Sequence, residues 1–174
     1  MLVASIPIIA LLGLLLFDRI WFAPRLEQIR IGVSHANPED QAPPPIMSRM
    51  ILASEGSSIY WQLTRILLHQ TLPAVPPSTT DSNLRSVAAL LLMRMHVSKS
   101  ESVSIYCSRI HVGNSSKGLS NASMALYNKP LSSLSPIEAA TVAAWPWSPD
   151  YFSRHPAALI QRRDYILAHS GSGL

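Results

Sequence analysis

Near residue 55 a single carboxylate is followed by side chains that can bind a sugar or a phosphate. Glu55 is the only acidic residue between positions 41 and 80. A carboxylate in such a setting can accept a proton from a sugar hydroxyl, while hydroxyl, amide and cationic groups hold an anionic, sugar-bearing substrate beside it. Glu55 is therefore the candidate catalytic residue. The candidate substrate-binding residues that follow it are Ser57, Ser58, Gln62 and Arg65.

A structural role is the alternative for each of these residues. An acid at the start of a helix interacts favourably with the helix dipole, which is a sufficient reason for Glu55 to be present. Gln62 and Arg65 could likewise be solvated side chains on the exposed face of a helix. The residue types alone leave both interpretations open.

Composition excludes several other kinds of site. The six histidines lack the paired spacing of a zinc site, so no protein-bound metal is predicted. The chain carries a net charge of +4, and from residue 46 onward eleven basic side chains face six acids. A basic surface suits anionic head groups or a pyrophosphate-linked substrate. Because Lys and Arg are not clustered, we expect no nucleic acid partner. Cys107 is the only cysteine and is expected to be buried.

The elements that must position these side chains are predicted to be mainly helical. Helices are expected over residues 57–69, 84–96 and 156–169, with a proline-containing break over residues 72–83. The helix from residue 84 is apolar on nearly every face, which is typical of a core helix or one lying against lipid. Ser135 and Glu138 form a capping box at the start of another helix, so capping is the favoured role of Glu138. Residues 113–128 are small and polar and are expected to form a loop.

The N-terminal part predicts a membrane anchor. Residues 1–17 contain no charged side chain, and the apolar stretch through residue 22 reaches the length of about 20 residues that a spanning helix needs. A cleaved signal peptide is the alternative, but a basic n-region is missing. Residues 23–45 are interpreted as a Pro-rich spacer, with residues 37–45 extended and stiff. The remaining domain covers residues 46–169.

The chain resembles the peptidoglycan glycosyltransferases, the family 51 transglycosylases of penicillin-binding proteins and their monofunctional relatives. Residues 55–67 are similar to that family's Gly-Gly-Ser-Thr-Ile-Thr-Gln-Gln-Leu-x-Lys/Arg-Asn-Leu motif. Residues 143–149 are similar to its Ala-Gly-Leu-Pro-Gln-Ala-Pro motif, with Trp147 at the position of the glutamine. Further matching segments follow in the family's order at residues 98–106, 109–114, 134–140 and 162–167.

The chain also departs from the family. The segment that separates the catalytic glutamate from the Gly-Ser-Thr motif is absent, so Glu55 directly precedes Gly56. Ser104 stands where the family has a second glutamate, and Ser108 stands at the position of the motif's asparagine. A hydroxyl cannot supply negative charge to a developing cationic sugar centre, so that role is lost or displaced.

The resemblance implies a lysozyme-like helical domain that acts on lipid-linked disaccharide-peptide in cell-wall synthesis. Glu55 would be the base, and Arg65 and Lys99 match family positions that can offset the charge of the leaving pyrophosphate. No cofactor is certain, although a divalent metal at the pyrophosphate could share that task. The resemblance places the domain outside the bacterial cytoplasmic membrane, whereas Arg19, Arg25 and Arg30 by themselves would favour the cytoplasmic side.

Two functions remain open at this point. The first is a reduced glycosyltransferase that uses Glu55, in keeping with the retained polar residues after it. The second is a non-catalytic module that binds the precursor, a glycan, or a partner such as an active penicillin-binding protein. The lost segment and Ser104 favour the second function and impaired catalysis.

Overall fold

A computed structural model describes residues 5–71 and 79–171, and it is mainly helical, as predicted. The only strands among these residues form a short antiparallel hairpin in which His111 pairs with Lys117. The elements in chain order are α1 (Ser5–Phe17), η2 (Asp18–Phe22), α2 (Ala23–Ser34), α3 (Pro38–Gln41), α4 (Pro45–Glu55), η3 (Gly56–Ser58), α5 (Ile59–Thr71), α6 (Thr79–His96), α7 (Lys99–Arg109), β1 (His111–Gly113), β2 (Ser116–Lys117), α8 (Leu119–Tyr127), η4 (Leu131–Ser133), α9 (Pro136–Ala144), η5 (Trp145–Trp147), α10 (Pro149–Arg154) and α11 (Pro156–His169).

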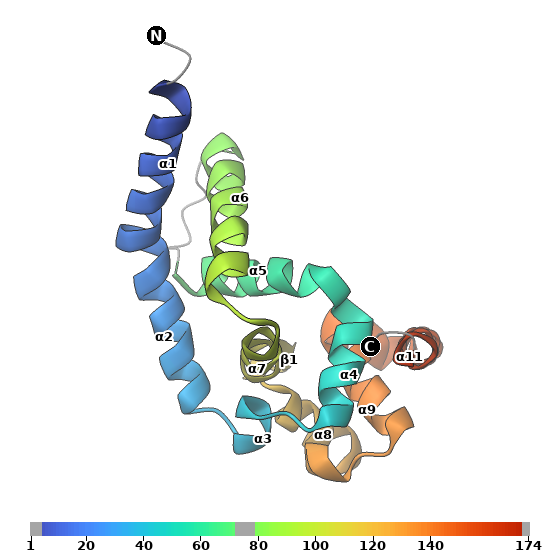
Figure 1. Ribbon diagram of the computed structural model, residues 1–174. Coiled ribbons are helices and arrows are strands. Elements are labelled where there is room, and N and C mark those ends of the chain that lie inside the picture. Colours follow the sequence, from blue (N-terminus) through green and yellow to red (C-terminus); the bar gives the residue numbers. More distant parts are fainter. Residues whose placement is uncertain (1–4, 72–78, 172–174) are drawn as a thin grey trace.

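The helices form two groups on either side of α7. Figure 1 shows α1 and α2 in line along one side of the molecule, with α6 beside α1, and α4, α9 and α11 on the other side. The π-helical turn η2 joins α1 to α2, and Asp18 in this turn lies 3.0 Å from His96 Nε2 at the end of α6. α5 runs between the two groups and packs against both α6 and α7. The candidate residues on α5 therefore lie where the groups meet.

The second group is organised around α9. Its four alanines from 139 to 144 are buried, and the helix packs against α4, α8 and α11. Small side chains let the helices approach closely. Ser135 and Glu138 form the predicted capping box, and Glu138 also accepts a 2.7 Å hydrogen bond from Lys129 Nζ. The structural role predicted for Glu138 is thus confirmed.

The predicted membrane-spanning helix over residues 1–22 is not supported. Within residues 5–71 and 79–171, none of the helices combines the length and the apolar character needed to cross a membrane. The thirteen uncharged residues of α1 are followed at once by Asp18 and Arg19 in η2.

The expected extended spacer over residues 37–45 is wrong, because residues 38–41 form the short helix α3. Asn37 caps this helix by accepting a hydrogen bond from the Glu39 amide. The side chains of α3 in turn reach distant helices. Glu39 accepts hydrogen bonds from the amides of Leu131 and Ser132 at the start of η4. The segment is an integral part of the fold.

A second local expectation, a loop over residues 113–128, is also wrong from Leu119 onward, because Leu119–Tyr127 forms α8. Its N-terminus is capped from outside the segment. Asp40 is buried and accepts a 3.0 Å hydrogen bond from the Ser120 amide. Gly118 adopts φ +94°, and a Cβ there would lie 2.6 Å from Asp40 Oδ2. The helix thus depends on a carboxylate 80 residues away, which no local pattern reveals.

The predicted helix over residues 84–96 starts earlier, at Thr79, while the helix over residues 156–169 is confirmed. The helix predicted over residues 57–69 begins with the 3₁₀ turn η3 and becomes α-helical at Ile59. Residues 72–78 of the expected proline-containing break lie outside the described residues.

Asp40 should make folding stability depend on pH. Burial raises its pKa to about 6, against the hydrogen bonds from Ser120 and Leu119 that favour the carboxylate. Since the folded chain holds this proton more tightly than the unfolded chain, ionisation lowers the free energy of unfolding as pH rises from about 4 to about 6. Relative to the Asp40→Asn variant, the free energy of unfolding of the parent should fall by about 2–3 kcal/mol over this pH range, as measured by urea titrations at each pH.

Glu39→Gln is the matched control with the opposite sign. Burial acts to raise the pKa of Glu39, but the hydrogen bonds from Ser132 and Leu131 outweigh it, so the pKa is lowered. Its contribution to stability is therefore present above the unfolded pKa and is lost as pH falls. If the free energy of unfolding depends on pH in the same way in the parent and in Asp40→Asn, the role assigned to Asp40 is contradicted.

Candidate active site

Glu55 lies at the corner between α4 and α5. α4 ends there because Gly56 adopts φ +52°, a conformation that side-chain-bearing residues rarely take. The turn η3 follows, and α5 starts at Ile59. The side chain of Glu55 points inward, and only 8% of the residue is exposed. The sharp corner thus places a carboxylate inside the molecule.

Four polar side chains surround this carboxylate. Ser54 Oγ and Tyr106 OH donate to Oε1 over 3.2 and 3.4 Å, and Gln62 Nε2 donates to Oε2 over 3.4 Å. These distances are at the long end of the hydrogen-bonding range, so each bond is weak. Ser58 Oγ lies 3.3 Å from Oε2 but donates its proton to the backbone oxygen of Glu55 over 2.5 Å. Burial and the negative charge of Glu55 raise the pKa of the Tyr106 phenol well above its usual value. Tyr106 therefore stays protonated and acts as a donor.

Arg162 brings a positive charge close to this junction. Its Nη2 donates to the backbone oxygen of Ser54 over 3.0 Å and to Ser54 Oγ over 3.3 Å. The guanidinium lies 4.8 Å from the ring centre of Trp147 and 5.2 Å from that of Tyr165. Ser54 thus links Glu55 to Arg162, which comes from the matched segment at residues 162–167.

A cavity of about 450 Å³ lies beside Gln62 and Tyr106, and we call it the basic pocket. Among the described residues that line it, none is acidic. Its basic and histidine side chains are Arg65, His69, Arg109, His111 and Lys117. Such a concentration of donors and positive charge fits an anion with several oxygens.

Four chain segments build the basic pocket. Arg65 and His69 lie one turn apart on α5 and share a face of that helix. The hairpin register places Lys117 opposite His111, and Trp145 Nε1 donates to the Val112 oxygen over 2.8 Å, which joins the hairpin to η5. α7 supplies the remaining cation, Arg109.

The side chain of Arg109 packs against α2. A Cβ at Gly32 would lie 2.7 Å from Nη1 of Arg109, so the guanidinium packs against the helix where a side chain is missing. Arg109, the last residue of α7, thus connects the N-terminal helices to the basic pocket.

Only some of the residues predicted from the sequence come together. Ser58 and Gln62 contact Glu55, and Gln62 and Arg65 line the basic pocket. Ser57 is exposed in η3 and lines none of the cavities described here.

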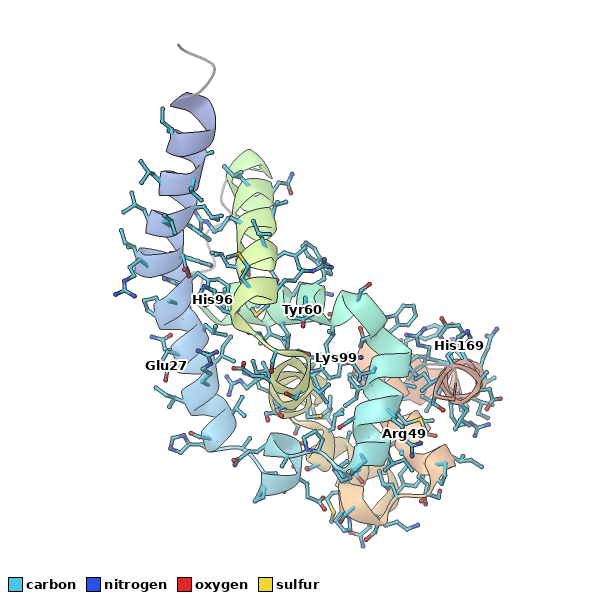
Figure 2. All side chains as sticks on the ribbon, in the orientation of Figure 1. Glu27, Arg49, Tyr60, His96, Lys99 and His169 are labelled. Atoms are coloured by element: carbon cyan, nitrogen blue, oxygen red, sulfur yellow. The ribbon has the colours of Figure 1, made fainter. Side chains whose placement is uncertain are left out.

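Lys99 lies apart from the basic pocket. It lines another cavity, of about 660 Å³, between α4 and α7, together with Ser104. Figure 2 shows Lys99 in the space between these two helices. Ser104 Oγ donates to the Ser100 oxygen over 3.4 Å and brings no charge to this cavity. Arg65 and Lys99 therefore cannot be assigned to one anion site.

Sequence reasoning missed several residues of the site. The spacing of Arg65 and His69 on one helix could have indicated a shared cationic face. Tyr106 and Arg109, one turn apart on α7, offered a similar signal. Lys117 gave none, and Arg162 stood out only as part of the family-like segment at residues 162–167. Only the folded chain brings Lys117 close to α5 and Arg162 close to α4.

The side chains of the basic pocket do not fit a divalent metal. In the part of the chain that the structure describes, no group of three or more His, Cys, Asp or Glu side chains could hold such an ion. Arginine and lysine would repel a cation.

Comparison with known proteins adds to this geometry. The family model described as Transglycosylase matches residues 47–170. Penicillin-binding protein 1A of Pseudomonas aeruginosa is 28% identical over 86 residues, which are 48% of this chain and 10% of that protein. The matched family region runs from α4 through α11 and includes Glu55, the basic pocket and Arg162. The chain therefore belongs to the transglycosylase family.

Proposed function

We propose that this protein binds the lipid-linked disaccharide-peptide precursor of peptidoglycan and does not polymerise it efficiently. The observation that carries the proposal is the separation of two parts of the site. The basic pocket is open and rich in cations, whereas the carboxylate next to it is enclosed by four polar side chains. Binding of the precursor would depend on the basic pocket, whereas transfer of a sugar would depend on the carboxylate.

The basic pocket suits the diphosphate of such a precursor. Three permanently charged side chains, Arg65, Arg109 and Lys117, converge on one cavity. Guanidinium groups match phosphate oxygens with pairs of hydrogen bonds, and lysine adds a compact charge. Gln62 offers an amide at the edge of the same cavity.

Transfer requires more than the site retains. A general base must come within hydrogen-bond reach of the attacking sugar hydroxyl. Both oxygens of Glu55 already accept hydrogen bonds, and the residue is buried, so a sugar would have to displace Tyr106 or Gln62. Ser104, at the position of the family's second glutamate, supplies no charge for the developing cationic sugar centre.

A minimal transferase is the second candidate. The contact between Glu55 and Gln62 supports it, because Gln62 lines the basic pocket and could exchange its bond to Glu55 for one to substrate. In this mechanism Glu55 would deprotonate the acceptor hydroxyl while Arg65, Arg109 and Lys117 neutralise the leaving diphosphate.

Membrane association belongs to the same proposal. Exposed apolar side chains gather on α1 and on one face of α6, which lie side by side in Figure 1. Those of α6 are Leu84, Val87, Leu91 and Met95. An exposed apolar surface of this kind fits the interfacial region of a bilayer. We place the domain on the outer side of the bacterial cytoplasmic membrane, where an active penicillin-binding protein could receive the precursor.

Removing one cation from the basic pocket should weaken precursor binding. Arg65→Ala should raise the Kd for the detergent-solubilised precursor about tenfold or more, the loss of one charge-assisted contact. Arg49→Ala is the matched control, because this exposed arginine on α4 lines neither the basic pocket nor the Lys99 cavity. Equal affinities for the two variants, measured by calorimetry, would refute the diphosphate site.

The enclosed carboxylate should matter more for stability than for turnover. Glu55→Gln replaces one of the two acceptor oxygens with an NH2 group that faces other donors, so we expect the free energy of unfolding to fall by about 1–3 kcal/mol. Neither the parent nor the variant should produce glycan chains from the precursor. Polymer from the parent and none from a folded Glu55→Gln protein would instead establish the minimal transferase.

The apolar face of α6 should contribute to vesicle binding. Changing Leu84 and Val87 together to serine removes two exposed apolar groups, so the partition coefficient on vesicles of phosphatidylglycerol and phosphatidylethanolamine should fall about fivefold to tenfold. Ile137→Ser, at an exposed position on α9, serves as the control and should change little. A similar decrease in both proteins, measured by sedimentation with vesicles, would argue against this surface.

A further inference from the structure

A second cavity, of about 550 Å³, shares Trp147 with the basic pocket. It lies between η5, α10 and α11, and we call it the aromatic pocket. Because Trp147 lines both cavities, the two are neighbours with a common wall. The residues that give the aromatic pocket its chemistry are Trp147, Ser148, Tyr151, Gln161, Arg162 and Tyr165.

Three aromatic residues of this pocket are well exposed. Trp147 is 63% exposed, Tyr165 48% and Tyr151 46%. Aromatic side chains carry a large apolar surface, and leaving three of them together in contact with water is unfavourable unless something covers them. The cluster therefore points to a ligand.

The rings are held in place before any ligand binds. Tyr151 stacks on His155 with ring centres 4.2 Å apart, and Tyr165 stacks on His169 at 4.1 Å. Arg162 lies over both Trp147 and Tyr165 and is itself fixed by its bonds to Ser54. Such preorganisation reduces the entropy lost when a ligand binds.

We propose that the aromatic pocket is a sugar-binding subsite that takes an N-acetylated hexosamine unit of a peptidoglycan glycan. This inference rests on the proposed function, since the sugar would belong to the molecule whose diphosphate occupies the basic pocket or to a strand beside it. The C–H groups of a sugar ring carry partial positive charge and pack on the electron-rich faces of aromatic rings. Ser148, Gln161 and Arg162 also line the pocket and provide hydrogen-bonding groups for the hydroxyl and acetamido groups.

The position of the pocket favours a sugar over a lipid chain. The Arg162 guanidinium lines it, and burying that charge against a hydrocarbon tail would be costly. The shared wall at Trp147 also sets the pocket directly beside the diphosphate site, where the sugar of a sugar diphosphate must lie. Trp147 replaces the glutamine of the similar family motif, so this ring is a feature of the present chain.

The test uses a soluble tetrasaccharide of N-acetylglucosamine and N-acetylmuramic acid that carries neither lipid nor phosphate. Binding to the full chain is followed by NMR through the indole N–H signals of the tryptophans. We expect the parent to bind, and Trp147→Ala and Tyr151→Ala each to weaken binding about tenfold, with partial recovery in Trp147→Phe. Trp61→Ala is the matched control, because Trp61 is 44% exposed on α5 and lines neither pocket.

Arg65→Ala separates this proposal from the proposed function. This variant should bind the tetrasaccharide with unchanged affinity but should bind the lipid-linked precursor more weakly. If the parent does not bind the tetrasaccharide, or if the parent and Trp147→Ala bind it equally well, the sugar subsite is overturned. This holds even if the precursor still binds through Arg65. Binding of a proline-rich peptide in place of the tetrasaccharide would also overturn it, in favour of a peptide groove. Tetrasaccharide binding through Trp147 without any effect of Arg65 on the precursor would instead refute the diphosphate site alone.

Discussion

The enclosed carboxylate of Glu55 is the contact on which the arrangement of the site depends. It sits at the corner between α4 and α5, accepts a hydrogen bond from Tyr106 on α7, and is linked through Ser54 to Arg162 on α11. Four helices thus meet at one buried charge. A buried carboxylate without these donors would be strongly unfavourable, so the corner between α4 and α5 is stable only with the donors around it. The basic pocket and the aromatic pocket both border this junction, through Tyr106 and Arg162 respectively.

The residues before the matched family region contribute to the same structure. Asp40 caps α8, Glu39 binds the start of η4, and Gly32 leaves room for the guanidinium of Arg109. Arg30 adds a 2.8 Å ion pair with Glu101 on α7. Because these contacts join α2 and α3 to α7, α8 and η4, the N-terminal helices cannot be regarded as an independent appendage. Their apolar surface at the proposed bilayer contact is connected to the basic pocket through packed side chains.

Sequence reasoning succeeded where the determining interactions are local. The capping box of Ser135 and Glu138 and the bounds of α11 follow from neighbouring residues, and Ser58 and Gln62 reach Glu55 because they lie three and seven positions after it. It failed where a distant group decides the outcome. α8 needs Asp40 as its cap, and Lys99 could be assigned to a cavity only once the orientation of α7 relative to α4 was known. The basic pocket combines four segments, so no single pattern could have revealed it.

The proposed loss of transfer with retention of binding is consistent with this geometry. Interactions made equally to substrate and transition state give affinity without accelerating the reaction, and the cations of the basic pocket can act in this way on a diphosphate. Acceleration needs groups that respond to charge developing at the sugar, namely an accessible base and a second carboxylate. Here the candidate base Glu55 is enclosed and Ser104 stands at the position of the family's second glutamate, whereas Arg65, Arg109 and Lys117 line the pocket. Since an aromatic wall at Trp147 would increase affinity for the sugar in the ground state, the two proposals together imply a site that holds the precursor without polymerising it.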